Sequence, residues 1–238
     1  IVIMLLIIIG GVGFLTWEDF YINKFKFKRY HMQSKVVLIT TAILIFAPAV
    51  FFFACDFGNL TVGKRLLASV FQSVTTRTAG FNTEDLSLMT EAGKAVMILL
   101  MLIGGSPSST AGGMKTTTFA VLILNAFATF RSREDVGAFG RRFDGQVIKS
   151  AATIAMMYFM LFFFGGITIS VYEGLPLLTC LYETASAVGT VGLTLGVTPG
   201  LHILSRVILI LLMYFGRVGG LTLIYAVISG TINKAKMP

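Results

Sequence analysis

The chain has 238 residues, of which 55% are hydrophobic and only 13% are charged. Soluble domains carry roughly a quarter charged residues, so this composition excludes a water-soluble globule, a coiled coil and a disordered tail, and it indicates a membrane protein. The net charge is +8, but the basic residues stand in short runs between apolar stretches. That pattern is typical of membrane topology, with lipid as the surrounding partner, and argues against nucleic-acid binding.

The chain opens on the apolar run IVIMLLIII, followed by GGVGFLTWEDF and then by the basic run KFKFKRYHMQSK. No basic residue precedes the apolar run, as it would in a signal peptide. We therefore expect the second half of a membrane helix whose beginning lies in a longer chain. Residues 1–30 are then the tail of a preceding unit and a cytoplasmic basic linker.

Three later stretches, at residues 36–54, 147–171 and 201–228, are apolar over about the 20 residues that a membrane-spanning helix needs. The region 91–130 is also mostly apolar, but GGSPSSTAGGMK interrupts it at residues 104–115. Glycine and proline free backbone groups that lipid cannot satisfy. This region therefore predicts a helix, an intramembrane loop and a second helix.

Two shorter apolar stretches, at 62–75 and 177–188, cannot cross a membrane, and each leads into a Gly-containing, Thr-rich turn. They predict re-entrant half-helices, which stop near the middle of the membrane and return as extended chain. The predicted fold class is thus all-helical and integral to the membrane, with repeated units of span, half-helix, return loop and span. We expect one unit at 31–146 with a broken second span, and another at 147–238 with an arginine in its second span.

An internal repeat relates these two units, because a shift of 112 residues lays one on the other without a gap over the key region. The shift places residues 78–81 (TAGF) on residues 190–193 (TVGL), and Gly104 on Gly216. A third copy of the ending stands at the start of the chain, where residues 10–13 (GGVG) resemble residues 216–219 (GRVG). The chain therefore holds two full units and the tail of one before them.

The repeated TAGF and TVGL segments suit the removal of water from a small cation. Backbone carbonyls must face an axis to replace the hydration shell, and glycine adopts backbone angles that other residues resist. The half-helix before each segment directs its negative C-terminal end toward the ion. One copy could be a surface turn that happens to contain Thr and Gly, but two copies at one register favour an ion filter.

Several segments resemble the Trk/Ktr/HKT family of potassium uptake proteins: SVTTRTAGFNTEDLS from residue 73, GGSPSSTAGGMKTTT from 104, YETASAVGTVGLT from 182 and YFGRVGGLT from 214. The match covers nearly the whole chain and comprises distinct motifs in the family's order. The resemblance implies a subunit of four pore units around one pore, each with a single filter glycine. This chain would supply the third and fourth units, and the first two are absent from it.

The resemblance also assigns site residues. The filter glycines are Gly80 and Gly192, and the residues that donate filter carbonyls are Thr78, Ala79, Thr190 and Val191. It implies that the loop at 104–115 is a gate below the filter, and the alternative for this loop is a kinked packing helix. The candidate gate residues are Gly104, Gly105, Ser106, Ser108, Ser109, Thr110, Gly112, Gly113 and Lys115, of which Lys115 is placed to obstruct cations by its charge.

Three charged residues lie close to these segments. Arg217 falls within a predicted span, where an ionisable residue is costly. We expect it to face the pore beneath the filter as a barrier, paired with carbonyls or hydroxyls of the gate loop; the alternative is that it only reaches the interface or the backbone. Arg77 and Glu183 lie beside the filter, and we expect them to brace it through hydrogen bonds.

Further predictions concern four acidic residues and a pair of glycines. The basic runs place their loops in the cytoplasm, which puts Asp56, Glu84, Asp85 and Glu173 on the outer side. Carboxylates there favour cation entry, although ordinary solvated loop charges are an equal alternative. Gly216 and Gly220 form a GxxxG pair for close helix packing.

The predicted function is potassium uptake across the plasma membrane through a backbone-carbonyl filter, gated by the loop at 104–115. The sequence offers neither a nucleophile with a plausible base nor a metal cluster, so we expect no enzyme and no cofactor, only transported potassium with or without sodium. The resemblance implies a homodimer and a cytoplasmic ring of nucleotide-binding regulatory subunits. Two alternatives stay open: a sodium-coupled or sodium-permeable transporter of the same architecture, and a non-conducting membrane assembly subunit.

Overall fold

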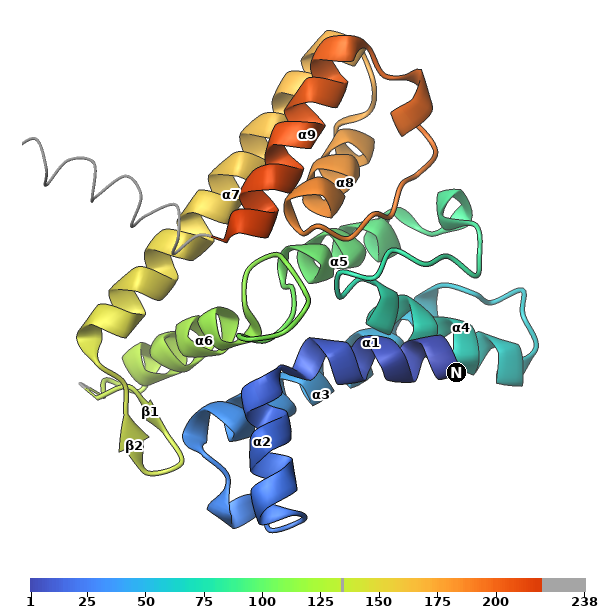
Figure 1. Ribbon diagram of the computed structural model, residues 1–238. Helices are drawn as coiled ribbons and strands as arrows, with labels where there is room; N and C mark the ends of the chain where they lie inside the picture. Colours follow the sequence, from blue (N-terminus) through green and yellow to red (C-terminus); the bar gives the residue numbers. More distant parts are fainter. Residues whose placement is uncertain (134, 220–238) are drawn as a thin grey trace, which may run out of the picture.

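Helices dominate the structure, a computed structural model that describes residues 1–133 and 135–219 (Figure 1). In chain order the elements are α1 (Val2–Val12), α2 (Phe14–Asn23), η1 (Phe27–Arg29), α3 (Met32–Cys55), α4 (Val62–Thr75), η2 (Leu86–Leu88), α5 (Glu91–Leu102), α6 (Thr116–Phe130), β1 (Gly137–Ala138), β2 (Arg141–Arg142), α7 (Gly145–Glu173), α8 (Leu177–Val188), η3 (Thr198–Gly200) and α9 (Ile203–Val218). The predominance of helix confirms the all-helical prediction. The short β1–β2 hairpin is an element that the sequence did not indicate.

Two helices of the described residues, α3 and α7, are long and apolar enough to cross a membrane. They contain the predicted spans 36–54 and 147–171. The interrupted region 91–130 forms α5 and α6 with a break between them, as predicted, and α4 and α8 coincide with the two short apolar stretches. The third predicted span corresponds to α9 up to Val218, and its remainder, residues 220–228, lies outside the described residues.

The elements of the two halves follow the same order at the same spacing. When α5 and η2 are shifted by 112 residues, their first residues fall on those of α9 and η3. The long helices α3 and α7 begin within one residue of this relation, and so do the ends of α4 and α8. The sequence repeat is therefore also a repeat of secondary structure.

The two halves meet where α5 packs against α8, with α7 and α9 on the other side of α8 (Figure 1). Met97 of α5 is fully buried in this core. The Gln72 amide lies 3.1 Å from the Met97 sulfur, and the Tyr182 hydroxyl lies 3.8 Å from it. A flexible, polarisable methionine suits this position, where it meets side chains from both halves.

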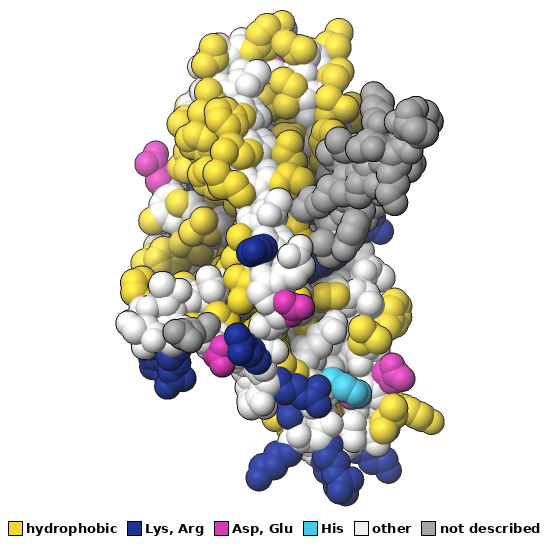
Figure 2. Space-filling view, turned by 90° about the vertical axis from the view of Figure 1, so that its left-hand side faces the viewer, with side chains coloured by type: hydrophobic (Ala, Val, Ile, Leu, Met, Phe, Trp, Pro, Cys, Tyr) yellow, Lys and Arg dark blue, Asp and Glu magenta, His cyan; other side chains and the backbone are white. Residues whose placement is uncertain are grey.

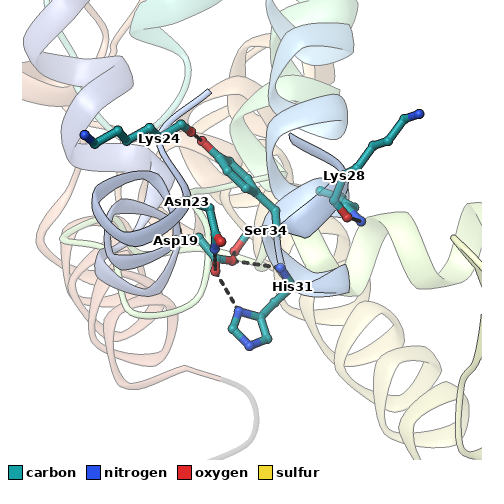
Figure 3. A network of polar contacts seen from close by, with 8 residues as sticks. Asp19, Asn23, Lys24, Lys28, His31 and Ser34 are labelled. Carbon is teal, nitrogen blue, oxygen red and sulfur yellow. Dashed lines mark hydrogen bonds and ion pairs between the residues drawn. The ribbon is translucent and has the colours of Figure 1, made fainter. Parts of the chain in front are cut away.

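A buried carboxylate attaches α2 to the start of α3 (Figure 3). Asp19 accepts hydrogen bonds from the backbone N–H of His31 at 3.0 Å and from the Ser34 hydroxyl at 2.5 Å, and its other oxygen lies 2.7 Å from the His31 ring. The first N–H groups of a helix lack partners within the helix and carry partial positive charge. Asp19 therefore satisfies the backbone N–H of the residue before α3 and places a negative charge at the positive end of this helix.

Carboxylates hold the starts of α5 and α9 in the same way. Asp56 accepts from the backbone N–H and the hydroxyl of Thr90, both at 2.9 Å. Glu173 accepts from the backbone N–H of His202 at 2.9 Å and from the Ser205 hydroxyl. Asp56 is 4% exposed and the Glu173 side chain 5% exposed. Asp56 Oδ1 and both Glu173 oxygens are thus engaged at helix starts, while Asp56 Oδ2 has no partner among the described residues, and attraction of cations by these carboxylates stays a prediction.

The first segment is bent rather than a single half-helix. Helices α1 and α2 meet at 93°, at Gly13, which has a φ of 91°. Gly219, at the end of α9, has nearly the same backbone angles, so the repeated GGVG and GRVG segments end in one conformation. The N–H of Phe14 donates to the carbonyl of Ser108 at 3.0 Å, and this bond attaches the bend to the loop between α5 and α6.

Close approach of two backbones explains the glycine at position 216. A Cβ on Gly216 would overlap the carbonyl oxygen of Val188, the last residue of α8. This contact confirms the predicted close packing of Gly216. Its predicted GxxxG partner, Gly220, lies outside the described residues.

We expect Gly216→Ala to lower the melting temperature of the full-length protein in detergent by several degrees. Overpacking costs roughly 1–3 kcal/mol. Each kcal/mol shifts the melting temperature by roughly 2–4 °C for a chain of 150–250 residues, and by less for the longer full-length protein. Gly63→Ala in α4 is the matched control, since its Cβ would meet nothing within 4 Å and alanine favours a helix. Equal losses of stability in both variants would contradict the close-packing argument.

Candidate functional site

The two predicted filter segments, residues 78–81 and 190–193, follow α4 and α8 and share one backbone conformation. The φ angles of Thr78 and Gly80 are 58° and 73°, and those of Thr190 and Gly192 are 53° and 93°. Positive φ is unfavourable for a β-branched residue such as threonine. Its occurrence at both equivalent threonines means that the repeat extends to the strained backbone.

The filter segments contact each other. A Cβ on Gly80 would overlap the carbonyl oxygen of Val191 and would lie 3.2 Å from the Cα of Gly192. Gly192 is exposed, and Thr78, Ala79 and Gly80 are partly exposed. The structure therefore brings the two predicted filter glycines side by side, with part of their backbone accessible.

Residues 103–115, which we call the central loop, separate α5 from α6 and correspond to the predicted gate. The two ends of the loop pair with each other: Gly104 donates to the carbonyl of Met114 at 2.8 Å, and Thr116 donates to the carbonyl of Gly105 at 3.1 Å. The hydroxyls of Ser106 and Thr116 lie 3.0 Å apart. The break is thus an ordered, hydrogen-bonded loop, and the alternative of a kinked packing helix is wrong.

The central loop also bonds to the ends of two helices. The N–H of Ser106 donates to the carbonyl of Gly11 in α1 at 3.0 Å, and the N–H of Gly113 donates to the carbonyl of Gly216 in α9 at 3.3 Å. These are the two copies of the repeated helix ending. The loop therefore joins the first segment of the chain to the last described helix.

Two cationic side chains bond to adjacent carbonyls of the central loop. Arg217 donates from Nη1 to the carbonyl of Thr110 at 2.8 Å, and Lys115 donates from Nζ to the carbonyl of Ala111 at 2.7 Å. Arg217 thus makes a carbonyl contact of the kind that the sequence predicted, while its action as a barrier stays a prediction. The Lys115 ammonium folds back onto its own loop.

The central loop lies directly against the second filter segment. A Cβ on Gly112 would overlap the hydroxyl of Thr190. The buried members of the predicted gate are Gly104, Gly105, Ser106, Gly112 and Gly113, and the more accessible members are Ser108, Ser109, Thr110 and Lys115. The loop therefore has a buried part beside the filter and an accessible tip.

Glu183 of α8 holds the chain that follows the second filter segment. Its Oε1 accepts from the Thr194 hydroxyl at 2.8 Å and from the Leu195 N–H at 2.9 Å, and its Oε2 accepts from the Thr198 hydroxyl at 2.8 Å. Glu183 is 5% exposed. Glu183 therefore makes the hydrogen bonds expected of a filter support.

Arg77 does not make the hydrogen bonds expected of a filter support. It is 6% exposed, and its Nε and Nη2 atoms have no hydrogen-bond partner among the described residues. The predicted hydrogen-bonded brace from Arg77 is therefore not formed in this part of the chain. No acceptor of the described residues reaches these two atoms, so the guanidinium remains a buried positive charge next to Thr78.

Two hydroxyl residues near the filter were missed by the sequence reasoning. The Ser186 hydroxyl accepts from the N–H of Gly192 at 3.1 Å, and the Thr75 hydroxyl donates to the carbonyl of Phe81 at 2.6 Å. Each residue lies in the last turns of the short helix that precedes its filter segment. The signal that could have identified both residues in the sequence is a hydroxyl side chain at a buried position of an apolar helix.

The site offers neutral oxygen atoms rather than charged ligands. Within residues 1–133 and 135–219, no three His, Cys, Asp or Glu side chains group as a metal site. Backbone carbonyls arranged around an axis can replace the hydration shell of an alkali cation. The chemistry available at the filter segments is therefore that of backbone carbonyls and hydroxyls, not that of a metal site among the described residues.

The chain was compared with known proteins. The family model "TrkH: Cation transport protein" matches residues 1–234. The Potassium/sodium uptake protein NtpJ of Enterococcus hirae is 36% identical over 236 residues, which cover 95% of this chain and 52% of that protein. The Ktr system potassium uptake protein B of Bacillus subtilis is 35% identical, with the same two coverages.

A solved structure supports the fold. The crystal structure of the potassium transporter TrkH from Vibrio parahaemolyticus has a TM-score of 0.74 and 17% sequence identity, and the match covers 94% of this chain and 50% of that one. This chain thus spans about half the length of the curated relatives it matches. Since the family model matches nearly every residue, the chain belongs to the TrkH family of cation transport proteins.

Proposed function

We propose that the chain forms part of a membrane protein that takes up potassium through a filter of backbone carbonyls. The observation that carries the proposal is the pair of filter segments, which share strained backbone angles and bring Gly80 and Gly192 side by side. The names of the relatives describe potassium uptake or potassium and sodium uptake. The filter segments and the names of the relatives support transport of an alkali cation rather than catalysis.

In this proposal, α4 and α8 are re-entrant pore helices, each followed by a filter segment. Their C-terminal ends carry partial negative charge from the helix dipole. The carbonyls of Thr78, Ala79, Thr190 and Val191 replace water around the cation. Positive φ at Gly80 and Gly192 turns the chain so that successive carbonyls can share one direction.

The central loop is the proposed gate. It lies against Thr190 of the filter and is held by hydrogen bonds to α1, α9 and the Arg217 side chain. Opening requires these bonds to be exchanged for others. Arg217 then acts in two ways, by holding the loop closed and by repelling cations below the filter.

The remaining features of the whole protein follow from the family. We propose a multi-pass protein of the plasma membrane with the basic loops in the cytoplasm. It forms a homodimer, binds nucleotide-binding regulatory subunits, and has two further pore units beyond those of this chain. Sodium coupling or sodium permeability is the second candidate, which the name of the Enterococcus hirae relative favours.

The filter proposal predicts that Gly192→Ser lowers the preference for potassium over sodium by tenfold or more. Serine disfavours the φ of 93° at this position, so the carbonyls must move. Rubidium and sodium uptake by the full-length protein would be measured in cells that lack their own potassium uptake, with and without external sodium. Gly200→Ser is the matched control, because its Cβ meets nothing within 4 Å.

Unchanged ion preference in an inserted Gly192→Ser variant would reject the filter assignment. Stimulation of rubidium uptake by sodium would favour the sodium-coupled transporter over a simple channel. Absence of uptake by the parent protein, with its regulatory subunits present, would favour a non-conducting assembly subunit.

Removal of the Glu183 carboxylate is expected to loosen the second filter segment. Glu183→Ala loses three hydrogen bonds to residues 194–198, and a bond to a charged group contributes roughly 1.5–3 kcal/mol. Amide hydrogen exchange in peptides covering 190–198 should become at least tenfold faster. Glu183→Gln keeps the oxygen that accepts two of these bonds and should show a smaller effect. Glu18→Ala, at an exposed position of α2, should show none. Equal exchange in all three variants would contradict the role of Glu183 as a filter support.

Loss of the Arg217 side chain is expected to raise the cation uptake rate by about tenfold. Arg217→Ala removes a charged hydrogen bond to the central loop, and a loss of roughly 1.5 kcal/mol corresponds to about tenfold in an opening equilibrium. Arg206→Ala is the control, because Arg206 lies on the same helix and also donates to backbone carbonyls, those of Leu201 and Pro199. Uptake that is unchanged in a normally inserted Arg217→Ala variant would remove the barrier from the mechanism.

A further inference from the structure

A groove of about 450 Å³ runs between α3 and α6 and is bordered by the β1–β2 hairpin. Of the residues that line it, Thr40 alone has a polar side chain, and the others are aliphatic or aromatic. Its volume lies in the range of ligand pockets, roughly 300–1,000 Å³. The walls therefore suit a hydrocarbon ligand and offer almost nothing to a polar one.

Large apolar side chains on both sides of this groove are exposed. Ile43 of α3 and Phe127 of α6 are 58% and 59% exposed, and Ile39 and Ile123 are each 41% exposed. They line a recess between two helices rather than a convex surface. An acyl chain can enter such a recess and contact helices on both sides.

The mouth of the groove is basic. Lys35 directly precedes the lining residue Val36, and its ammonium lies 5.7 Å from the ring centre of Phe139, which also lines the groove. Arg141 and Arg142 follow on the second strand of the same hairpin; Arg142 pairs with Asp135 at 2.8 Å, and Arg141 is exposed. Lys and Arg side chains gather at this end of the molecule, below the apolar surface (Figure 2). A negative group is therefore favoured at the mouth.

The hairpin presents Phe139 in an unfavourable conformation. Phe139 and Gly140 form a two-residue turn, and both have positive φ, 53° and 77°. Asn, Asp and Gly are preferred at the first position of such a turn, and a bulky aromatic residue is an outlier there. Its ring stands beside the Lys35 ammonium at the groove mouth, in the manner of the aromatic residues that mark a membrane interface.

We propose that this groove binds one anionic phospholipid of the inner leaflet. One acyl chain lies between α3 and α6, and the phosphate lies beside Lys35 and Arg141. The lining residues 36–43 of α3 extend over about 10 Å at 1.5 Å per residue, which reaches from the interface into one leaflet. The basic mouth selects anionic over zwitterionic lipid. This site is independent of whether the chain conducts ions.

Native mass spectrometry of the full-length protein tests the proposal, after detergent purification and addition of phosphatidylglycerol or phosphatidylcholine. We expect one phosphatidylglycerol to bind at least tenfold more tightly than phosphatidylcholine.

Lys35→Gln should weaken phosphatidylglycerol binding about fivefold, the effect of one basic residue at a membrane surface, while Lys64→Gln at the exposed start of α4 should not. Ile123→Trp should fill the groove and abolish the binding, while Ile210→Trp, on the exposed face of α9, should not.

A second measurement identifies the occupant directly and does not depend on how Ile123→Trp folds. A photoreactive amino acid at position 123, in the protein within its native membrane, should form adducts with phosphatidylglycerol. Adducts with a second copy of the chain or with another segment of the protein would overturn the proposal. Equal binding of the two lipids, or phosphatidylglycerol binding that survives Ile123→Trp in a folded variant, would overturn it as well.

Discussion

Hydrogen bonding of the central-loop backbone is the constraint on which the arrangement of the other elements depends. A break in an apolar helical region exposes N–H and C=O groups that lipid cannot satisfy, so the protein must supply their partners. The loop ends bond to each other, and the middle of the loop bonds to Gly11 at the end of α1 and to Gly216 at the end of α9. These bonds fix the ends of α1 and α9 against the loop between α5 and α6.

Close packing around the central loop explains why glycine is needed at two positions. Gly112 leaves room for the side chain of Thr190, and Gly216 leaves room for the carbonyl of Val188 at the end of α8. The proposed gate therefore cannot move without breaking bonds at several helix ends. Its movement is coupled to the packing of both halves through the contacts that hold it.

Helix positions followed closely from the sequence, because apolar length is a local property. The short helices α4 and α8, the spans α3 and α7 and the break between α5 and α6 all appear where apolar runs and glycine clusters predict them. The repeat of 112 residues located the two filter segments, and their shared φ angles agree with it. Contacts between distant residues were less accessible. The carboxylates of Asp56 and Glu173 bond to residues 34 and 29 positions later, which directly precede α5 and α9. Arg77 lacks the hydrogen bonds expected of it.

The sequence by itself determined the membrane character, the repeated units and the break that forms the central loop, and it located the residues of the proposed filter. All of these are encoded in runs of hydrophobicity and in motifs of a few neighbouring residues. Only the tertiary structure decided that Arg217 bonds to Thr110 and that the β1–β2 hairpin borders a groove between α3 and α6. Each of these depends on where chain segments far apart in sequence come to lie. Their meeting is set by the packing of whole helices, which no local pattern encodes.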